Sequence, residues 1–351
     1  MPNVKTDTED ITMIKNDDSP IVFYQYFDTT DTGFFQKKVL ERFRATGHDR
    51  PVEFRVWNCY NDQPGTDGDL FSYDCICLNA LSDKGYFRQL PEIIGTDGIF
   101  QWMLDTTRYK RNLYSLPFLT CYNAVICRKK DFHGINNVYD IKGKIVTPLR
   151  SMLAYYYLIS FAGYQGEKFD QVTLSKNAVG VIKMLARLMG GKQEVERSAF
   201  GTFDGAEKFN SGEADYFIGF TENLRNLKKD DYCVIPANFS DKKQIDVPLF
   251  STDVLSVGKN TEAEKLLDCI DLIEIMTDPE FEYSICAPDG NLSYMLPANE
   301  ASYKKLIEKD TVYKTLFDTV SREDNCVFRF SKDYYELLPK LENSLMDALK
   351  S

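Results

Sequence analysis

The sequence predicts an α/β protein built from two lobes. Strand-like runs alternate with helix-like segments, which is typical of sheets covered by helices. That alternation begins again partway along the chain and later returns to the first unit, so the chain is expected to cross between the lobes twice. The expected division is a flexible tail at 1–18, lobe 1 at 19–127 plus 249–310, lobe 2 at 128–248, and C-terminal helices at 311–351 that pack on the lobes. A ligand would lie in a cleft between two mixed, mostly parallel sheets.

The first unit alternates strands and a helix. Strands are expected at 20–27, 52–58 and 73–81, and a helix at 34–43, where the apolar residues recur at helical spacing. The run at 73–81 reads as a buried strand that would place Cys75 and Cys77 on one face. These elements predict the parallel sheet of lobe 1.

Residues 111–128 form the junction around which the chain is organised. Leu113–Pro117 reads as the end of one extended segment, and Cys121–Cys127 as the start of a buried strand. Pro117 suits a break, because it cannot donate to a strand ladder. Cys121 therefore lies near a junction, where a thiol with a neighbouring base could act as a nucleophile. The alternative is a buried cysteine that serves as a small apolar side chain.

The second unit and the return to lobe 1 are mostly helical. A short strand is expected at 142–148, helices at 151–161, 175–191 and 204–212, and a strand at 216–220. Gly190 and Gly191 would end the second of these helices, and the tyrosine run at 155–157 is interpreted as packing. Thr261 and Glu264 fit a capping box at the start of a later helix. The last ~50 residues are expected to be helical, with a kink near Pro339.

Charge and cysteine content restrict the partners and the compartment. The formal net charge of −11 argues against nucleic acid or an anionic membrane as the main partner, and it is compatible with a cationic ligand. Nine cysteines show no disulfide framework, and two histidines make a zinc site improbable. The first residues resemble no secretory signal, so a cytoplasmic location is expected, or a secreted or periplasmic one if a signal has been removed.

Seven segments, in order, carry a resemblance to a known family. They are IVFYQYFD, VWNCYNDQP, YDCICLNALSDKGYF, LYSLPFLTC, GFTE, STDVLSV and GNLSYMLPA. Three of them place candidate reactive groups, namely Cys121, Glu222 just past a strand-like run, and Asp253 within another. Together they resemble thiaminase I, the thiamin pyridinylase family, over most of the chain.

The resemblance implies a fold, a reaction and a set of site residues. The fold is the type II periplasmic-binding-protein architecture, and the reaction replaces the thiazole of thiamin with an amine, pyridine or thiol. Cys121 is implied as the nucleophile and Glu222 as its base. The implied substrate-binding residues are Tyr24, Tyr26, Tyr60, Asp74, Phe203, Phe220 and Asp253. No cofactor or metal is implied, and a monomer is expected.

Other functions, and other roles for single residues, are also compatible with the sequence. The chain could be a solute-binding protein for thiamin or a related pyrimidine, because a fold does not fix a function. An enzyme of pyrimidine-precursor synthesis on the same fold would use a histidine-rich site, which two histidines disfavour. Asp253 could be a strand-end cap, and the tyrosines could be ordinary packing. Phe220 and Ser251 stand where bacterial thiaminases have tyrosines, which leaves the preference for the second substrate open.

Overall fold

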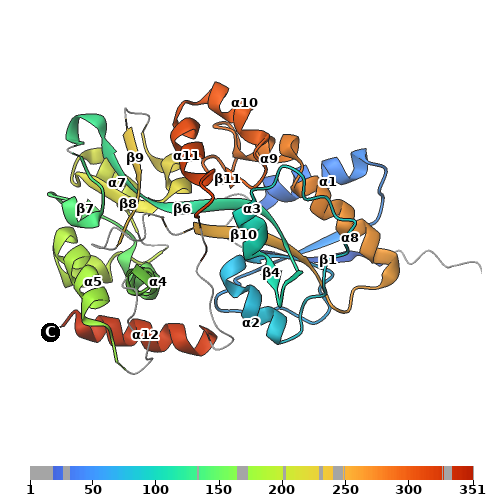
Figure 1. Cartoon of the computed structure of the whole chain (residues 1–351), viewed down its shortest axis with the longest axis horizontal. Coiled ribbons are helices and arrows are strands. Elements are labelled where there is room, and N and C mark those ends of the chain that lie inside the picture. Colours follow the sequence, from blue (N-terminus) through green and yellow to red (C-terminus); the bar gives the residue numbers. More distant parts are fainter. Residues whose placement is uncertain are drawn as a thin grey trace, which may run out of the picture.

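Strand β6 (Leu116–Arg128) joins the two halves of the molecule (Figure 1). Its first half pairs with β10 (Phe250–Val257) and its second half with β8 (Tyr216–Phe220) and β9 (Tyr232–Pro236), all antiparallel. The partner changes between Tyr122, opposite Phe250, and Asn123, opposite Phe220. One long strand therefore belongs to the sheets of both lobes.

The computed structural model describes residues 19–26, 32–132, 134–163, 173–200, 203–228, 232–239, 248, 250–325, 327 and 334–350. The tail at 1–18 lies outside these residues. The other strands are β1 Ile21–Tyr26, β2 Val52–Trp57, β3 Leu70–Asp74, β4 Arg108–Tyr109, β5 Asn112–Leu113, β7 Ile145–Val146 and β11 Leu296–Pro297. The helices are α1 Thr32–Ala45, α2 Leu78–Asp83, α3 Gln101–Thr106, α4 Leu149–Gly163, α5 Lys176–Met189, α6 Lys192–Glu196, α7 Gly205–Ser211, α8 Ala263–Met276, α9 Pro279–Cys286, α10 Ser302–Lys309, α11 Val312–Val320 and α12 Tyr334–Ala348. None of the helices in this described part combines the length and apolarity that a bilayer crossing requires.

The sheet is mixed, in the order β2-β1-β3-β10-β6-β8-β7, with β9 and β11 also paired to β6. Parallel pairs among the described strands are β1 with β2, β1 with β3, and β7 with β8. The strands that cross between the lobes are antiparallel to their neighbours, so the sheets are less parallel than the sequence predicted. Antiparallel pairing follows because β6 and β10 traverse the junction in opposite directions.

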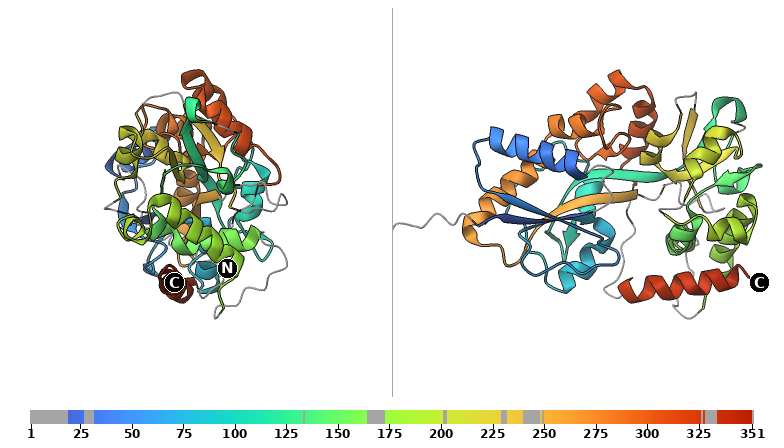
Figure 2. Two further views of the ribbon diagram at one scale, coloured as in Figure 1. Left: turned by 90° about the vertical axis from the view of Figure 1, so that its left-hand side faces the viewer. Right: turned by 180° about the vertical axis from the view of Figure 1, so that it is seen from behind.

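Helices cover both faces of this sheet (Figures 1 and 2). Helix α1 packs against α8 in lobe 1, whereas α4 packs against α5 and α12 in lobe 2. Alternate residues of β6 enter different apolar cores: Tyr122 and Ala124 lie in one, Val125 and Cys127 in the other. A strand buried on both faces reads as a continuous apolar run, as β6 does.

Two local predictions about the first unit are wrong. The strand expected at 73–81 ends at Asp74, whose side chain accepts a hydrogen bond from the Ile76 amide and caps a 3₁₀ turn, Cys75–Cys77, that leads into α2. The separate segments expected at 113–117 and 121–127 are joined in one strand, β6, and Pro117 lies inside it. The register against β10 shifts next to it, between Asp253 and Val254, and such an irregularity accommodates a residue without an amide hydrogen.

Of two predicted helix ends, the C-terminal end of α5 is confirmed and the N-terminal cap of α8 is wrong. Helix α5 ends at Gly190 in the left-handed region (φ 108°), as predicted, and it begins after Ser175, whose hydroxyl accepts from the Ala178 amide. The predicted capping box of α8 is wrong, because the Thr261 hydroxyl donates to the carbonyl of Asp69 instead. A tertiary hydrogen bond thus takes the place of the expected local cap.

Candidate active site

A cavity of about 790 Å³ lies where β6 and β10 meet segments of lobe 2. Side chains from both lobes line it, and so do Leu338, Pro339 and Glu342 of α12. Among the described cysteines, none of which is in a disulfide, Cys121 is the one that lines this cavity. The cavity therefore gathers residues that lie more than 300 positions apart in the chain.

One face of the β6–β10 pair forms the floor of the cavity. Leu119 and Cys121 are two residues apart on β6, and Ser251 and Asp253 are two residues apart on β10. Because side chains alternate along a strand, each pair points to the same face. Cys121 lies directly opposite Ser251, and Leu119 opposite Asp253. The pairing thus sets the thiol beside a hydroxyl and one diagonal step from a carboxylate.

Asp74 supports this floor from the next strand. It lies opposite Asp253 across β3 and β10, and it is fully buried. Its carboxylate accepts hydrogen bonds from the Tyr60 hydroxyl (2.5 Å), the Ser251 hydroxyl and the Ile76 amide (3.0 Å). Burial raises the pKa of Asp74, and the hydrogen bonds from Ser251, Tyr60 and Ile76 partly offset that rise. Asp74 and Asp253 place two carboxyl groups on one face, which suits a cationic ligand.

Tyr26 and Tyr60 line the cavity beside this acidic pair. Their ring centroids are 6.1 Å apart in an edge arrangement. Burial, and then the nearby Asp74, raise the pKa of Tyr60 well above its ordinary value, so the hydroxyl remains a proton donor. Flat aromatic surfaces of this kind can stack on a ligand ring.

Glu222 enters the cavity from lobe 2. It lies in the first turn of a 3₁₀ helix, η4 (Thr221–Asn226), which follows the end of β8 directly. Phe220, the last residue of β8, lines the cavity beside it and lies 6.3 Å from the ring of Tyr155. The structure therefore brings Cys121, Glu222 and Asp253 to one cavity although they come from three segments.

Tyr24 does not line this cavity. It precedes Tyr26 by two residues, about 6.6 Å along β1, and its hydroxyl accepts from Arg55 and donates to Asp67 (both 3.2 Å). Its ring stacks on Phe71 at 5.3 Å. The cavity lies at the carboxyl end of β1, so the earlier tyrosine is left outside it.

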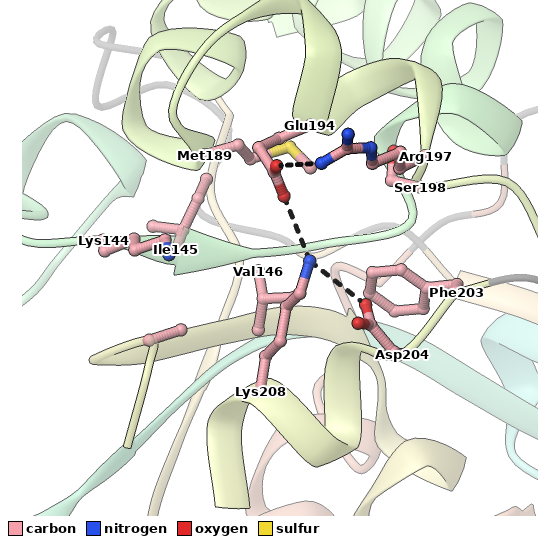
Figure 3. Close-up of a pocket in the computed structure, with 11 residues that line it drawn as sticks. Lys144, Ile145, Val146, Met189, Glu194, Arg197, Ser198, Phe203, Asp204 and Lys208 are labelled. Atoms are coloured by element: carbon pink, nitrogen blue, oxygen red, sulfur yellow. Dashed lines mark hydrogen bonds and ion pairs between the residues drawn. The ribbon is translucent and has the colours of Figure 1, made fainter. Parts of the chain in front are cut away.

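Phe203 does not line it either, and Figure 3 shows where its ring lies. It borders a separate hollow of about 10 Å³, enough space for about one water. There Lys208 pairs with Glu194 (3.0 Å) and Asp204 (3.3 Å), and Arg197 pairs with Glu194 (3.2 Å). This hollow is the interior of an ion-pair network.

Sequence reasoning missed several residues that line the cavity. Tyr155 was interpreted as packing, yet its hydroxyl is buried beside the cavity without a hydrogen-bond partner among the described residues, whereas Tyr156 and Tyr157 lie in the core. Helical spacing held a weak signal, because Ser151 and Met152 share the face of α4 that carries Tyr155. Two arginines, Arg150 and Arg225, and Glu342 were also missed.

A cluster of possible metal ligands lies elsewhere in lobe 1. The two ring nitrogens of His48 face Asp268 (3.0 Å) and Asp271 (3.2 Å), and Arg50 also pairs with Asp268 (2.6 Å). Each carboxylate already has a cationic or hydrogen-bonding neighbour. The arrangement ties the segment after α1 to α8.

The chain is similar to known thiaminases in sequence and in structure. The chain is 25% identical to the curated thiaminase-1 of Paenibacillus thiaminolyticus over 369 residues, which cover 94% of this chain and 87% of that protein. The structure of Clostridium botulinum thiaminase I in complex with thiamin matches with a TM-score of 0.84 and 23% identity, covering 94% of this chain and 100% of that one. A maltose-bound binding protein of T. maritima matches with a TM-score of 0.71 and 15% identity, covering 94% and 97% of the two chains.

These matches confirm the predicted resemblance to thiaminase I and the predicted type II periplasmic-binding-protein fold. The family model described as bacterial extracellular solute-binding protein matches residues 64–315, which is well over half of the chain. The chain therefore belongs to the bacterial extracellular solute-binding protein family.

Proposed function

We propose that this protein is a thiaminase I, a transferase that cleaves thiamin and gives its pyrimidinylmethyl group to an amine, a pyridine or a thiol. The observation that carries the proposal is that Cys121, Glu222 and Asp253 line one interlobe cavity. The similarity to the curated thiaminase-1 supports it. A cationic substrate would find the carboxyl group of Asp253 on the floor of the cavity, with that of Asp74 buried behind Tyr60 and Ser251.

In the proposed reaction Glu222 takes the proton of the Cys121 thiol. The thiolate forms a C–S bond with an electron-poor carbon of the pyrimidine ring, and the proton passes to a ring nitrogen. The thiazolium then leaves as neutral thiazole, because its nitrogen keeps the electron pair of the broken C–N bond. The incoming nucleophile bonds to the exposed methylene carbon and gives its proton to the carboxylate. Finally, the C–S bond breaks with its electron pair on sulfur, the thiolate takes the proton held by the carboxyl group, and the ring nitrogen of the product releases its proton to water.

The charged groups of the cavity favour these steps. The positive substrate stabilises the thiolate, and burial of a carboxyl group brings its proton affinity nearer to that of a thiol. Cys121 is only 5% exposed, so bulk water would have little access to the covalent intermediate. Tyr26 and Tyr60 would stack on the substrate rings.

The test is product analysis by mass spectrometry after incubation with thiamin and aniline or 2-mercaptoethanol. Free thiazole and the corresponding pyrimidinylmethyl adduct are expected. Cys121→Ser should abolish turnover, because a hydroxyl is much harder to deprotonate, and a pyrimidine with a leaving group on its ring should label residue 121 once. The matched control is Cys233→Ser, which alters a more exposed cysteine on β9 outside the cavity.

A second candidate function is solute binding without chemistry, which family membership favours. Thiamin that binds but is never cleaved with any amine or thiol supplied would support it and refute the transferase. A label on Cys233, or full turnover by Cys121→Ser, would refute the assignment of the nucleophile.

A further inference from the structure

The lobe 2 side of the cavity carries two arginines that the reaction above does not use. Arg150 lies in the first turn of α4, and Arg225 lies in η4, three residues after Glu222. Both line the cavity. In a chain with a formal net charge of −11, these two guanidinium groups balance the Glu222 and Glu342 carboxyl groups that line the same side of the cavity.

Arg225 has hydrogen-bond donors that the described residues leave unused. Its Nε and Nη1 atoms are buried and have no hydrogen-bond partner there. A guanidinium group offers five donors in a planar fork, and buried donors are nearly always paired, because lost contacts with water must be replaced. A ligand with a hydrogen-bond acceptor could pair with these two donors of Arg225 when it enters the cavity.

Arg150 forms a weak ion pair with Glu342 at the same cavity. Its Nη1 is 3.5 Å from Oε2 of Glu342 on α12, which is at the limit of a hydrogen bond. Burial raises the pKa of Glu342, although Arg150 opposes that rise. The positive end of the α4 dipole lies at the same turn. A stronger acceptor, such as an oxyanion, could therefore compete for Arg150.

We propose that Arg225, together with Arg150, forms an anion subsite, and that the protein prefers a substrate that carries an oxyanion. The inference rests on the proposed function and names its substrate class. The oxyanion could belong to the acceptor, as the sulfonate or carboxylate of a thiol or amine, or to a phosphate ester of thiamin. A bidentate contact with an oxyanion matches the guanidinium fork.

The two sides of the cavity would then bind groups of opposite charge. The carboxyl group of Asp253 in lobe 1, with the buried Asp74 behind it, faces the cationic ring system, and the arginines of lobe 2 face the anion. The volume of about 790 Å³ lies in the upper part of the roughly 300–1,000 Å³ typical of small-molecule sites. Space for a donor and an acceptor is thus compatible with the cavity.

The test compares two thiols that differ in charge, 2-mercaptoethanol and 2-mercaptoethanesulfonate, with thiamin as the donor. The readout is the ratio of their kcat/KM values, because a ratio cancels general effects on folding or on the nucleophile. Wild type should prefer the sulfonate, and Arg225→Gln should reduce the preference about 10- to 100-fold, as for a lost hydrogen bond to a charged group. Arg225→Lys should retain part of it, and Arg44→Gln, an exposed position on α1, should retain all of it.

A second arm distinguishes the source of the oxyanion. Calorimetric titration of Cys121→Ser protein compares thiamin with thiamin monophosphate, each with and without Arg225→Gln. An Arg225-dependent preference for the phosphate ester supports a donor anion, and a preference seen only with the thiols supports an acceptor anion.

The outcomes separate the two proposals. If wild type turns over both thiols and Arg225→Gln changes neither the ratio nor the binding of thiamin monophosphate, the subsite is refuted while the transferase stands. If neither thiol reacts, the transferase fails, and the titration still decides the subsite: an Arg225-dependent preference upholds it, and equal binding of the two ligands refutes it.

Discussion

Removal of the Tyr60 hydroxyl should weaken the use of thiamin by changing the protonation of Asp74. The Tyr60→Phe change deletes a buried hydrogen bond of 2.5 Å to the Asp74 carboxylate and leaves the bonds from Ser251 and the Ile76 amide. The lost bond favours the charged form, so its removal raises the pKa of Asp74 further above its ordinary value. Asp74 would then be neutral over a wider pH range.

The magnitude follows from the charge on the acceptor. A hydrogen bond to a charged group contributes about 1.5–3 kcal/mol, which corresponds to about a 10- to 100-fold fall in kcat/KM for thiamin. The acid limb of the pH profile should move to higher pH, because the carboxylate that balances the cationic ring forms later. Steady-state rates with a fixed amine, measured across the pH range, report both effects.

The matched control is Tyr24→Phe on the same sheet. That hydroxyl bonds Arg55 and Asp67 outside the cavity, so neither kcat/KM nor the acid limb should change. An acid limb that stays in place or moves to lower pH in Tyr60→Phe would refute the reasoning about Asp74. Equal effects of the two substitutions would refute the distinction between the two tyrosines.

Three further predictions concern other parts of the chain. Glu222→Gln should lower kcat about 10²–10⁴-fold, as for a lost acid–base group, whereas the exposed Glu213→Gln should not; equal rates for Glu222→Gln and wild type would exclude Glu222 as the base. Burial raises the pKa of Glu282 well above its ordinary value. Above about pH 4.3 the folded protein therefore keeps a proton on Glu282 that the unfolded chain releases. The free energy of unfolding should then fall as pH rises toward the folded pKa. Glu282→Gln should flatten that slope in urea unfolding, and a slope that stays unchanged would exclude Glu282 as its source. Tyr155→Phe should raise the free energy of unfolding by about 1 kcal/mol, because it removes a buried hydroxyl without a partner among the described residues, and it should raise KM for thiamin; a loss of stability would mean that the hydroxyl is bonded.

Prediction from sequence was most accurate where the determinants are local. The end of α5 at Gly190 depends on groups within one turn of the helix. It was least accurate for the apolar run at 73–81. A buried run carries no periodicity that separates a strand from a helix, and the strand ends where the Asp74 carboxylate bonds the amide two residues ahead.

The site residues also differ in how far the sequence could predict them. Resemblance of short segments selected Cys121, Glu222 and Asp253, and these residue types are what nucleophilic and acid–base chemistry require. It could not place Tyr24 outside the cavity and Tyr26 inside it, because both have the same parity on β1 and only the position of the strand's end distinguishes them.

By itself, the sequence determined the alternation of strands and helices, the fold class and the candidate reactive groups, since these depend on residue type and short-range spacing. Only the tertiary structure decided that Tyr155 and Arg225 border the cavity and that the Thr261 hydroxyl bonds Asp69 rather than capping α8. The physical reason is that β6 and β10 carry two lobes from distant parts of the chain to one junction. Which side of a helix or turn faces that junction is set by packing between the lobes, and helical spacing carries only a weak signal of it.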